Sequence, residues 1–249
     1  MKRTHPLVLA SCSLAFLLPC MNQRASAGVF ELDMNSLPTA QGWSYRDWYN
    51  MVPESSVFSI QDKVLTMNTI GTPMNIGVTE SPAPVYVRTG LPDLDKPFSV
   101  ELTAKVAGQQ TFANPNNHFG FTVAAWLGGG AGLAAAGIDQ QYVQDVHVSA
   151  TTVPWDNTVF HTYRMDVTPA VGYQVYVDGA IAFSSPMRNE GPPPAGESII
   201  YFGDGTGGEN TLVEITRVTI TTVPEPASTA LVIGVGALAW AAVRRRQSS

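Results

Sequence analysis

The stretch Phe160–Phe183, FHTYRMDVTPAVGYQVYVDGAIAF, decides the fold class of this 249-residue chain. Apolar and polar residues alternate along most of it, which is the pattern of a β-strand that buries one face. The pair Asp178-Gly179 separates two such runs, and an Asp-Gly pair in this position is a strong signal for a two-residue hairpin turn. The stretch therefore predicts a meander of three strands at 160–167, 173–177 and 180–183.

The alternation continues on both sides of the meander. The segment HFGFTVAAW at 118–126 places its two phenylalanines, Val123 and Ala125 on one face and Trp126 on the other. No long segment shows helical periodicity, and prolines interrupt the connections at short intervals. Further strands are predicted at 57–67 (two short ones), 98–106, 142–148, 198–203 and 212–220. Residues 28–222 are therefore expected to form a single all-β sandwich.

Parts of this body resemble a known family. WDNTVFHTYRMDVTPAVGYQVYVDG (155–179), followed by the glycine-rich YFGDGTGG (201–208), is similar to the concanavalin A-like, laminin-G-type jelly roll. That family has an aromatic-His-x-Tyr strand leading into a Tyr-Val-Asp-Gly hairpin. The opening FELDMNSLPTAQGW (30–43) also resembles the Asp-containing first strand of such domains. The resemblance rests on strand patterns and implies a concanavalin A-like jelly-roll β-sandwich.

Residues 1–27 have the three parts of a secretory signal peptide. Two basic residues near the start precede an apolar run at 7–18, which is too short to cross a membrane as a mature helix. Ala25 and Ala27 then supply small residues at the two positions that signal peptidase reads, so cleavage is predicted before Gly28. A buried N-terminal helix is the alternative. We therefore expect secretion.

The chain ends in an uncharged span followed by a basic cluster. Pro226–Val243 holds 18 residues without a formal charge, and about 17 is the lower limit for a helix that crosses a bilayer. Arg244, Arg245 and Arg246 follow, and arginines stay on the cytoplasmic side of a membrane. We therefore predict a short transmembrane helix, with the body outside and the C-terminus in the cytoplasm. A buried core helix is the alternative.

The order of these parts closely resembles the PEP-CTERM sorting signal. Pro224, Glu225 and Pro226 form the motif, and the helix and the arginine cluster follow it. The resemblance implies that an exosortase, a membrane-embedded cysteine transpeptidase-like enzyme, recognises the tail 223–249 and removes it. It also implies a Gram-negative bacterium that makes exopolysaccharide, with the processed protein at the cell surface or in the extracellular biofilm matrix.

The body between the two signals is acidic. Residues 28–222 carry eight Lys and Arg against nineteen Asp and Glu, a net charge of −11, compared with −6 for the whole chain. Such a body repels phosphate backbones, which argues against nucleic acid as a partner. Cys12 and Cys20 both lie in the predicted signal peptide, so the mature chain is expected to have no disulfide and no cysteine nucleophile or metal site.

No familiar catalytic pattern occurs in the body. Glycosidases of the jelly-roll family carry a Glu-x-Asp-x-x-Glu strand, and retaining chemistry needs the two glutamates about 5 Å apart. The only Glu-x-Asp here is Glu31-Leu32-Asp33, and Ser36 stands where the second glutamate would be. No Gly-x-Ser-x-Gly elbow is present, so His161, which shares a strand face with Tyr163, is interpreted as structural. The four histidines offer no zinc spacing.

Three residues are candidates for binding a sugar. Asp145 and His147 alternate onto one face of their predicted strand, and Trp126 lies opposite the apolar face of its own. Aromatic and polar groups on the face away from the inter-sheet core can stack on sugars and hydrogen-bond to them. The alternative is that Trp126 packs under a loop and that Asp145 is merely solvated.

One loop is a candidate for calcium. The segment GDGTGGEN (203–210) brings Asp204, Glu209 and Asn210 together among glycines, and oxygen ligands on such a loop suit calcium. Asp and Gly are also ordinary turn residues, which is the alternative. No cofactor is required by any motif, and a structural calcium ion is the one that the sequence suggests.

Two classes of function remain. The first is an exported, non-catalytic surface or matrix protein whose jelly roll binds glycan or simply builds the matrix. The second is a polysaccharide-acting enzyme, a glycoside hydrolase or lyase, with an unfamiliar site. The missing glutamate pair and the sorting signal favour the first. Its expected partners are signal peptidase and an exosortase during export, the inner membrane transiently, and extracellular polysaccharide.

Overall fold

A computed structural model describes residues 28–48, 52–72, 83–111, 120–146, 151–194, 196–205 and 209–222. These residues belong to one compact unit, Gly28–Val223. The signal peptide predicted at 1–27 and the tail predicted at 223–249 lie outside the described residues.

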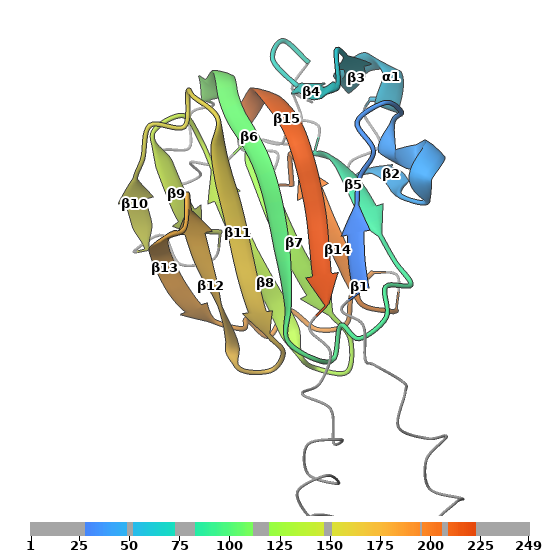
Figure 1. The fold of residues 1–249 in the computed structure, drawn as a ribbon, viewed down its shortest axis with the longest axis vertical. Helices are drawn as coiled ribbons and strands as arrows, with labels where there is room; N and C mark the ends of the chain where they lie inside the picture. The colour runs from blue at the N-terminus through green and yellow to red at the C-terminus, as the bar shows by residue number, and fades with distance from the viewer. Residues whose placement is uncertain are drawn as a thin grey trace, which may run out of the picture. The chain divides into compact units, whose positions relative to one another are not determined.

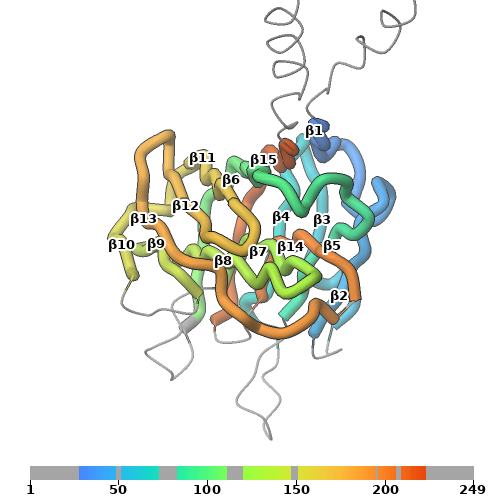
Figure 2. The backbone as a smooth tube through the Cα atoms, turned by 90° about the horizontal axis from the view of Figure 1, so that it is seen from below, coloured from blue at the N-terminus to red at the C-terminus, as the bar shows by residue number. Residues whose placement is uncertain are grey.

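Two antiparallel sheets lie face to face, here named sheet A and sheet B (Figures 1 and 2). The eight described strands of sheet A follow the order β13 (Ala180–Pro186), β12 (Gly172–Val177), β11 (His161–Thr168), β6 (Phe98–Thr111), β15 (Glu209–Thr222), β4 (Val64–Asn68) and β3 (Phe58–Gln61), with β1 (Gly28–Glu31) also paired to β15. The seven of sheet B follow the order β10 (Thr152–Pro154), β9 (Tyr142–Asp145), β8 (Gly132–Ile138), β7 (Phe121–Leu127), β14 (Ile199–Gly203), β5 (Pro84–Arg88) and β2 (Ser44–Asp47). Two single-turn helices, η2 (Pro38–Gln41) and α1 (Glu54–Val57), connect the first strands. The all-β sandwich predicted from the sequence is confirmed.

The longest ladder joins β6 to β15 in the middle of sheet A. Each strand has 14 residues, and their antiparallel register runs from Glu209 opposite Thr111 to Thr222 opposite Phe98. The register shifts twice along the ladder, and β-bulges of this kind increase the local twist. On its other edge β15 pairs with β4 and then, nearer its C-terminal end, with β1. One strand therefore holds three others in place.

The core lies between the sheets because successive side chains of a strand point to opposite faces. In β7, Phe121, Val123 and Ala125 join the inter-sheet core and Trp126 lies on the other face, as predicted. The largest fully buried side chains include Tyr86, Phe121, Phe202, Leu65, Met67 and Leu102.

The predicted Asp178-Gly179 hairpin turn forms, and a second one connects the two short strands expected within 57–67. Asp178 and Gly179 connect β12 to β13 with φ of 50° and 79°, and Asp62 and Lys63 connect β3 to β4 with φ of 51° and 63°. Two successive residues with positive φ mark the type of turn that matches the twist of a hairpin.

His161 fastens the β12–β13 turn to the start of β11. Its Nδ1 lies 2.6 Å from Asp178 Oδ2, and its Nε2 lies 2.8 Å from the Asp156 carbonyl oxygen. Asp178 Oδ1 accepts the Thr162 N–H at 2.9 Å. The bond from Thr162, followed by that from His161, holds the pKa of Asp178 below its usual range. These contacts agree with the structural role inferred for His161.

Alternation did not predict five of the described strands: β1, β2, β5, β8 and β10. The strand β8, GLAAAGI, is buried along its whole length, so it shows no alternation, and alanine and glycine are uncommon in strands. The strand β5, PVYVR, is also a continuous buried run that ends at the half-buried Arg88. By contrast, β6 and β15 are longer than predicted, because their mutual pairing continues beyond the residues that show alternation.

Acid should weaken the β12–β13 turn. A depressed pKa in the folded chain means that Asp178 contributes stability above its unfolded pKa of about 3.9 and loses it as the pH falls through the folded pKa. Asp178→Asn, which the turn geometry tolerates, should therefore lower the melting temperature at pH 7 and have a smaller effect near pH 3. Thermal unfolding across this range measures the difference. Asp62→Asn, in the other hairpin turn, is the control, and an Asp178→Asn effect that is equal at both pH values would contradict the prediction.

Candidate functional site

The two ends of the body lie side by side. Gly28, before which signal-peptidase cleavage is predicted, pairs with Thr222 at the end of β15. Both predicted processing points therefore adjoin the same end of the sandwich. Among the described residues, no helix is long and apolar enough to cross a membrane. The remaining processing residues lie outside the described residues: Ala25, Ala27, Pro224, Glu225, Pro226, Arg244, Arg245 and Arg246.

Trp126 lies on the outer face of sheet B, as expected, among apolar neighbours. We call this cluster the outer apolar face; its buried members are Val85, Val87, Ala124, Leu133, Ala135, Ile199 and Tyr201. Trp48, Trp126 and Val146 are partly buried against them. A sugar site needs several convergent polar groups, and the central strands supply few of them on this face.

A connection between the sheets covers part of the outer apolar face. The strap, residues 187–194, leads from β13 toward β14 (Figure 2), bridges to the edge of β8 at Arg188 and then reaches Trp126 of β7. Arg188 and Leu133 exchange two backbone hydrogen bonds, with N···O distances of 2.8 and 3.0 Å. The Trp126 indole N–H donates to the Gly191 carbonyl at 3.1 Å. Trp126 therefore packs under a loop, which is the alternative that the sequence left open.

The strap also brings a carboxylate near this face. Burial raises the pKa of the Tyr201 hydroxyl above its usual range, and the negative charge of Glu190 raises it further. Glu190 is itself ion-paired with Arg188 within the strap. The Glu190 carboxylate therefore stabilises the strap through its ion pair with Arg188.

Asp145 faces the core and not the outer face. It pairs with Ala136 of β8 and lies on the same side of β9 as Val143, toward sheet A. The residue is 2% exposed, and its carboxylate accepts a short hydrogen bond from the Ser185 hydroxyl of β13. This corrects the expectation that Asp145 shares a ligand-binding face with Trp126, because the end of β9 instead approaches the edge strand of sheet A. His147 lies outside the described residues.

The three residues suggested as calcium ligands are fully buried near the ends of β14 and β15. Asp204 Oδ2 accepts a hydrogen bond from Thr69 at 3.0 Å, and Glu209 Oε1 accepts one from Gln109 at 2.9 Å. Asn210 donates to a threonine hydroxyl, and its Oδ1 has no hydrogen-bond partner among the described residues. Among the residues that the structure describes, no three His, Cys, Asp or Glu side chains are grouped to hold a metal ion. Calcium binding stays a prediction.

Buried carboxylates in the described residues hold the fold together. Asp47 accepts two backbone N–H groups at 2.9 and 3.0 Å, and Asp139 accepts two at 2.6 and 2.7 Å. Asp145, Asp204 and Glu209 accept hydrogen bonds from side chains. Hydrogen bonds of this kind satisfy buried carboxylate oxygens and fix the orientation of the group. All five acids are buried within the described fold.

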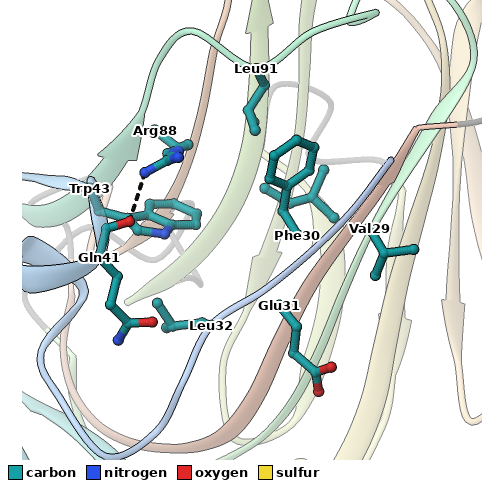
Figure 3. A pocket seen from close by; sticks show the side chains of 9 residues that line it. Val29, Phe30, Glu31, Leu32, Gln41, Trp43, Arg88 and Leu91 are labelled. Atoms are coloured by element: carbon teal, nitrogen blue, oxygen red, sulfur yellow. Dashed lines mark hydrogen bonds between the residues drawn. The ribbon is translucent and has the colours of Figure 1, made fainter. Parts of the chain in front are cut away.

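A pocket lies where β1, the segment after η2 and the end of β5 meet (Figure 3). Its volume is about 260 Å³. We call it the Arg88 pocket, and it is lined chiefly by Phe30, Gln41, Trp43, Arg88 and Leu91. Two aromatic rings, an apolar rim and one guanidinium therefore converge on a small space.

The backbone near η2 fixes the geometry of this pocket. Arg88 Nη1 donates to the Gln41 carbonyl at the end of η2, at 2.8 Å. Gly42 ends the helix with φ of 81°, and a Cβ at this position would collide with the Arg88 guanidinium. Trp43 follows, is 9% exposed, and packs edge-to-face on Phe202 with 5.1 Å between ring centroids. The indole and the guanidinium are therefore held by rigid neighbours.

The sequence does not reveal this pocket. Phe30 and Trp43 are the two ends of the segment 30–43, Arg88 lies in a later segment, and no motif joins the three. Only composition draws attention to Arg88 in the sequence, because it is one of eight Lys and Arg residues in an acidic body.

Removing the Trp126 hydrogen bond should loosen the strap. Trp126→Phe keeps a ring but deletes the N–H donor to Gly191, and we expect it to lower the free energy of unfolding by about 1 kcal/mol. Urea unfolding measures this change, and tryptic cleavage after Arg188 should become faster. Trp48→Phe, in the same cluster, is the control because its indole nitrogen makes no hydrogen bond among the described residues. Equal losses in the two variants would show that only ring size matters.

Comparison with solved structures supports the fold. The laminarinase from Rhodothermus marinus is 14% identical, with a TM-score of 0.51 over 77% of this chain and 95% of its own. Alginate lyase Aly36B is 8% identical, with a TM-score of 0.50 over 79% of this chain and 97% of its own. Likeness at such low identity shows the fold alone.

Sequence comparison identifies the tail. The PEP-CTERM protein-sorting motif matches residues 222–246, and no curated protein matches the chain. Such a motif implies processing by an exosortase and a place at the cell surface. The motif begins at Thr222, the last residue of β15. The chain thus carries a PEP-CTERM sorting motif directly behind a concanavalin A-like jelly-roll body.

Proposed function

We propose that this protein is exported, cut at both ends and retained at the cell surface or in an exopolysaccharide matrix, where its body binds glycan without cleaving it. The position of the sorting motif carries this proposal, because the motif begins where the last strand ends. No described strand extends beyond Thr222, so removal of the tail after Val223 leaves the sandwich whole. Before removal, residues 226–243 anchor the precursor in the inner membrane of a Gram-negative bacterium.

Two observations support glycan as the ligand class and binding as the activity. The two similar structures are by name a laminarinase and an alginate lyase, which makes polysaccharide the reasonable partner for an exported jelly roll. The buried carboxylates of the described residues are hydrogen-bonded within the fold, and the central strands of sheet B present an apolar outer face. Neither the buried carboxylates nor the outer apolar face supports glycoside hydrolysis by a pair of carboxyl groups.

Processing should remove both ends of the chain. Mass spectrometry of protein recovered from the cell surface or medium should show a mature species that begins at Gly28 and lacks the tail beyond Val223. A strain without the exosortase should instead retain the protein in the inner membrane, with its arginine cluster present. Secreted material that still ends in Arg244-Arg245-Arg246 would contradict this prediction.

The mature protein should bind polysaccharide and leave it uncut. A glycan array should show retention on neutral or acidic glycans, and reducing-end assays on β-glucans, galactans and alginates should show no turnover. Because the body has a net charge of −11, retention along extended polyanions should require calcium and be lost with a chelator. Turnover that disappears on neutralising one Asp or Glu would establish the alternative, a glycoside hydrolase or lyase.

A further inference from the structure

Arg88 differs from most basic residues of the body. Five of the eight lie within ion-pair distance of a carboxylate: Lys96, Lys105, Arg164, Arg188 and Arg217. Arg88 has no such carboxylate among the described residues, and its hydrogen bond goes to the neutral Gln41 carbonyl. A guanidinium has five N–H donors in a planar fork, so Arg88 retains donors for a ligand.

We propose that the Arg88 pocket binds one hexuronic acid unit, the carboxylate-bearing pyranose of acidic polysaccharides. Arg88 holds the carboxylate through its N–H donors, while Trp43 and Phe30 pack against the C–H face of the sugar ring. An Arg fork matches a carboxylate geometrically, and aromatic walls suit the apolar face of a pyranose. This inference rests on the proposed function, because it names the sugar that the glycan-binding body selects.

The size of the pocket limits the ligand to a single ring. Its volume of about 260 Å³ lies below the roughly 300–1,000 Å³ typical of sites for drug-sized ligands. Leu91 and Phe30 border the space opposite Arg88 and Trp43 (Figure 3). The pocket therefore receives the end or a branch of a polysaccharide, and not a long internal segment.

The acidity of the body does not oppose this site. Glu31 is the one acid that lines the pocket, and Figure 3 shows its side chain pointing away from Arg88. The Glu31 carboxylate is 3.2 Å from Arg217 Nε, so its charge is partly neutralised. Exposed charges farther than about 8 Å are largely screened at physiological ionic strength. A single bound carboxylate therefore interacts mainly with the charges next to the pocket. A long polyanion is instead repelled by the acidic groups of the whole body.

Arg88 also has a structural contact, and the experiment must separate the two roles. The bond to Gln41 lies at the C-terminal end of η2, where a cation satisfies the last carbonyl groups of a helix. A purely structural Arg88 would affect stability and leave ligand preference unchanged. A ligand-binding Arg88 determines which sugar is preferred.

Isothermal titration calorimetry on the full chain in a polyoxyethylene detergent tests the proposal with three probes. D-glucuronate has both the ring and the carboxylate, D-glucose has only the ring, and acetate has only the carboxylate. We expect glucuronate to bind at least about tenfold more tightly than either of the others, which corresponds to ~1.4 kcal/mol. Binding should weaken with added salt and be unaffected by a calcium chelator.

Three variants assign the effect to the pocket. Arg88→Gln should reduce glucuronate affinity at least about tenfold and leave the weak binding of glucose unchanged. Arg88→Lys keeps the charge but loses the fork, and it should give an intermediate affinity while protecting the fold. Arg46→Gln is the matched control, because the Arg46 guanidinium lies over the Trp48 ring, outside the pocket. Circular dichroism verifies that each variant is folded.

The outcomes distinguish this inference from the proposed function. Equal affinity for glucuronate and glucose, or unchanged glucuronate binding in folded Arg88→Gln, would overturn the inference. Retention on the glycan array that Arg88→Gln does not alter would also overturn it, while leaving the proposed function in place. Glucuronate binding that depends on Arg88, in a protein that retains no polysaccharide, would support the pocket and refute the broader function.

Discussion

The pairing of β6 with β15 is the constraint on which the rest of the sandwich depends. The two strands are separated by about a hundred residues in the chain, yet they form the longest ladder of sheet A. Through β15 they also place β4 and β1, and through β6 they place the β11–β13 meander. Closing such long-range contacts has an entropic cost that local turns do not have, and the hydrophobic core between the sheets offsets it. The same ladder brings Gly28 beside Thr222, so both predicted processing points leave the fold at one place.

Packing decides which surfaces are open to a ligand. The strap crosses part of the outer apolar face of sheet B. Trp126, the sequence-based candidate for sugar stacking, is hydrogen-bonded to Gly191 of that strap. The Arg88 pocket forms elsewhere, where Gly42 leaves room for a guanidinium between η2 and β5. An arginine without an ion pair, in a pocket lined by two aromatic rings, is the arrangement in the described residues most suited to an anionic sugar.

The sequence predicted the local features well and the shared surfaces less well. Alternation located β7 and the meander, and the Asp178-Gly179 pair located the turn between β12 and β13, because each depends on neighbouring residues only. The strand β8 was missed because it is buried on both faces, which removes the alternation that marks a strand. Asp145 was placed on the wrong face for a related reason. Its position follows from pairing with β8 and from contact with Ser185 of the other sheet, and neither can be read from its own segment.

The sequence by itself determined the sorting motif, the acidic charge and the all-β class, since these depend on composition, local order and short-range periodicity. The sorting motif is the clearest case, because its parts follow one another along the chain and need no folded partner. Only the tertiary structure decided that Trp126 lies under the strap, that the buried acids serve the fold, and that Phe30, Trp43 and Arg88 share a pocket. These arrangements join segments far apart in sequence, and their contacts arise when the β6–β15 ladder brings the two layers together.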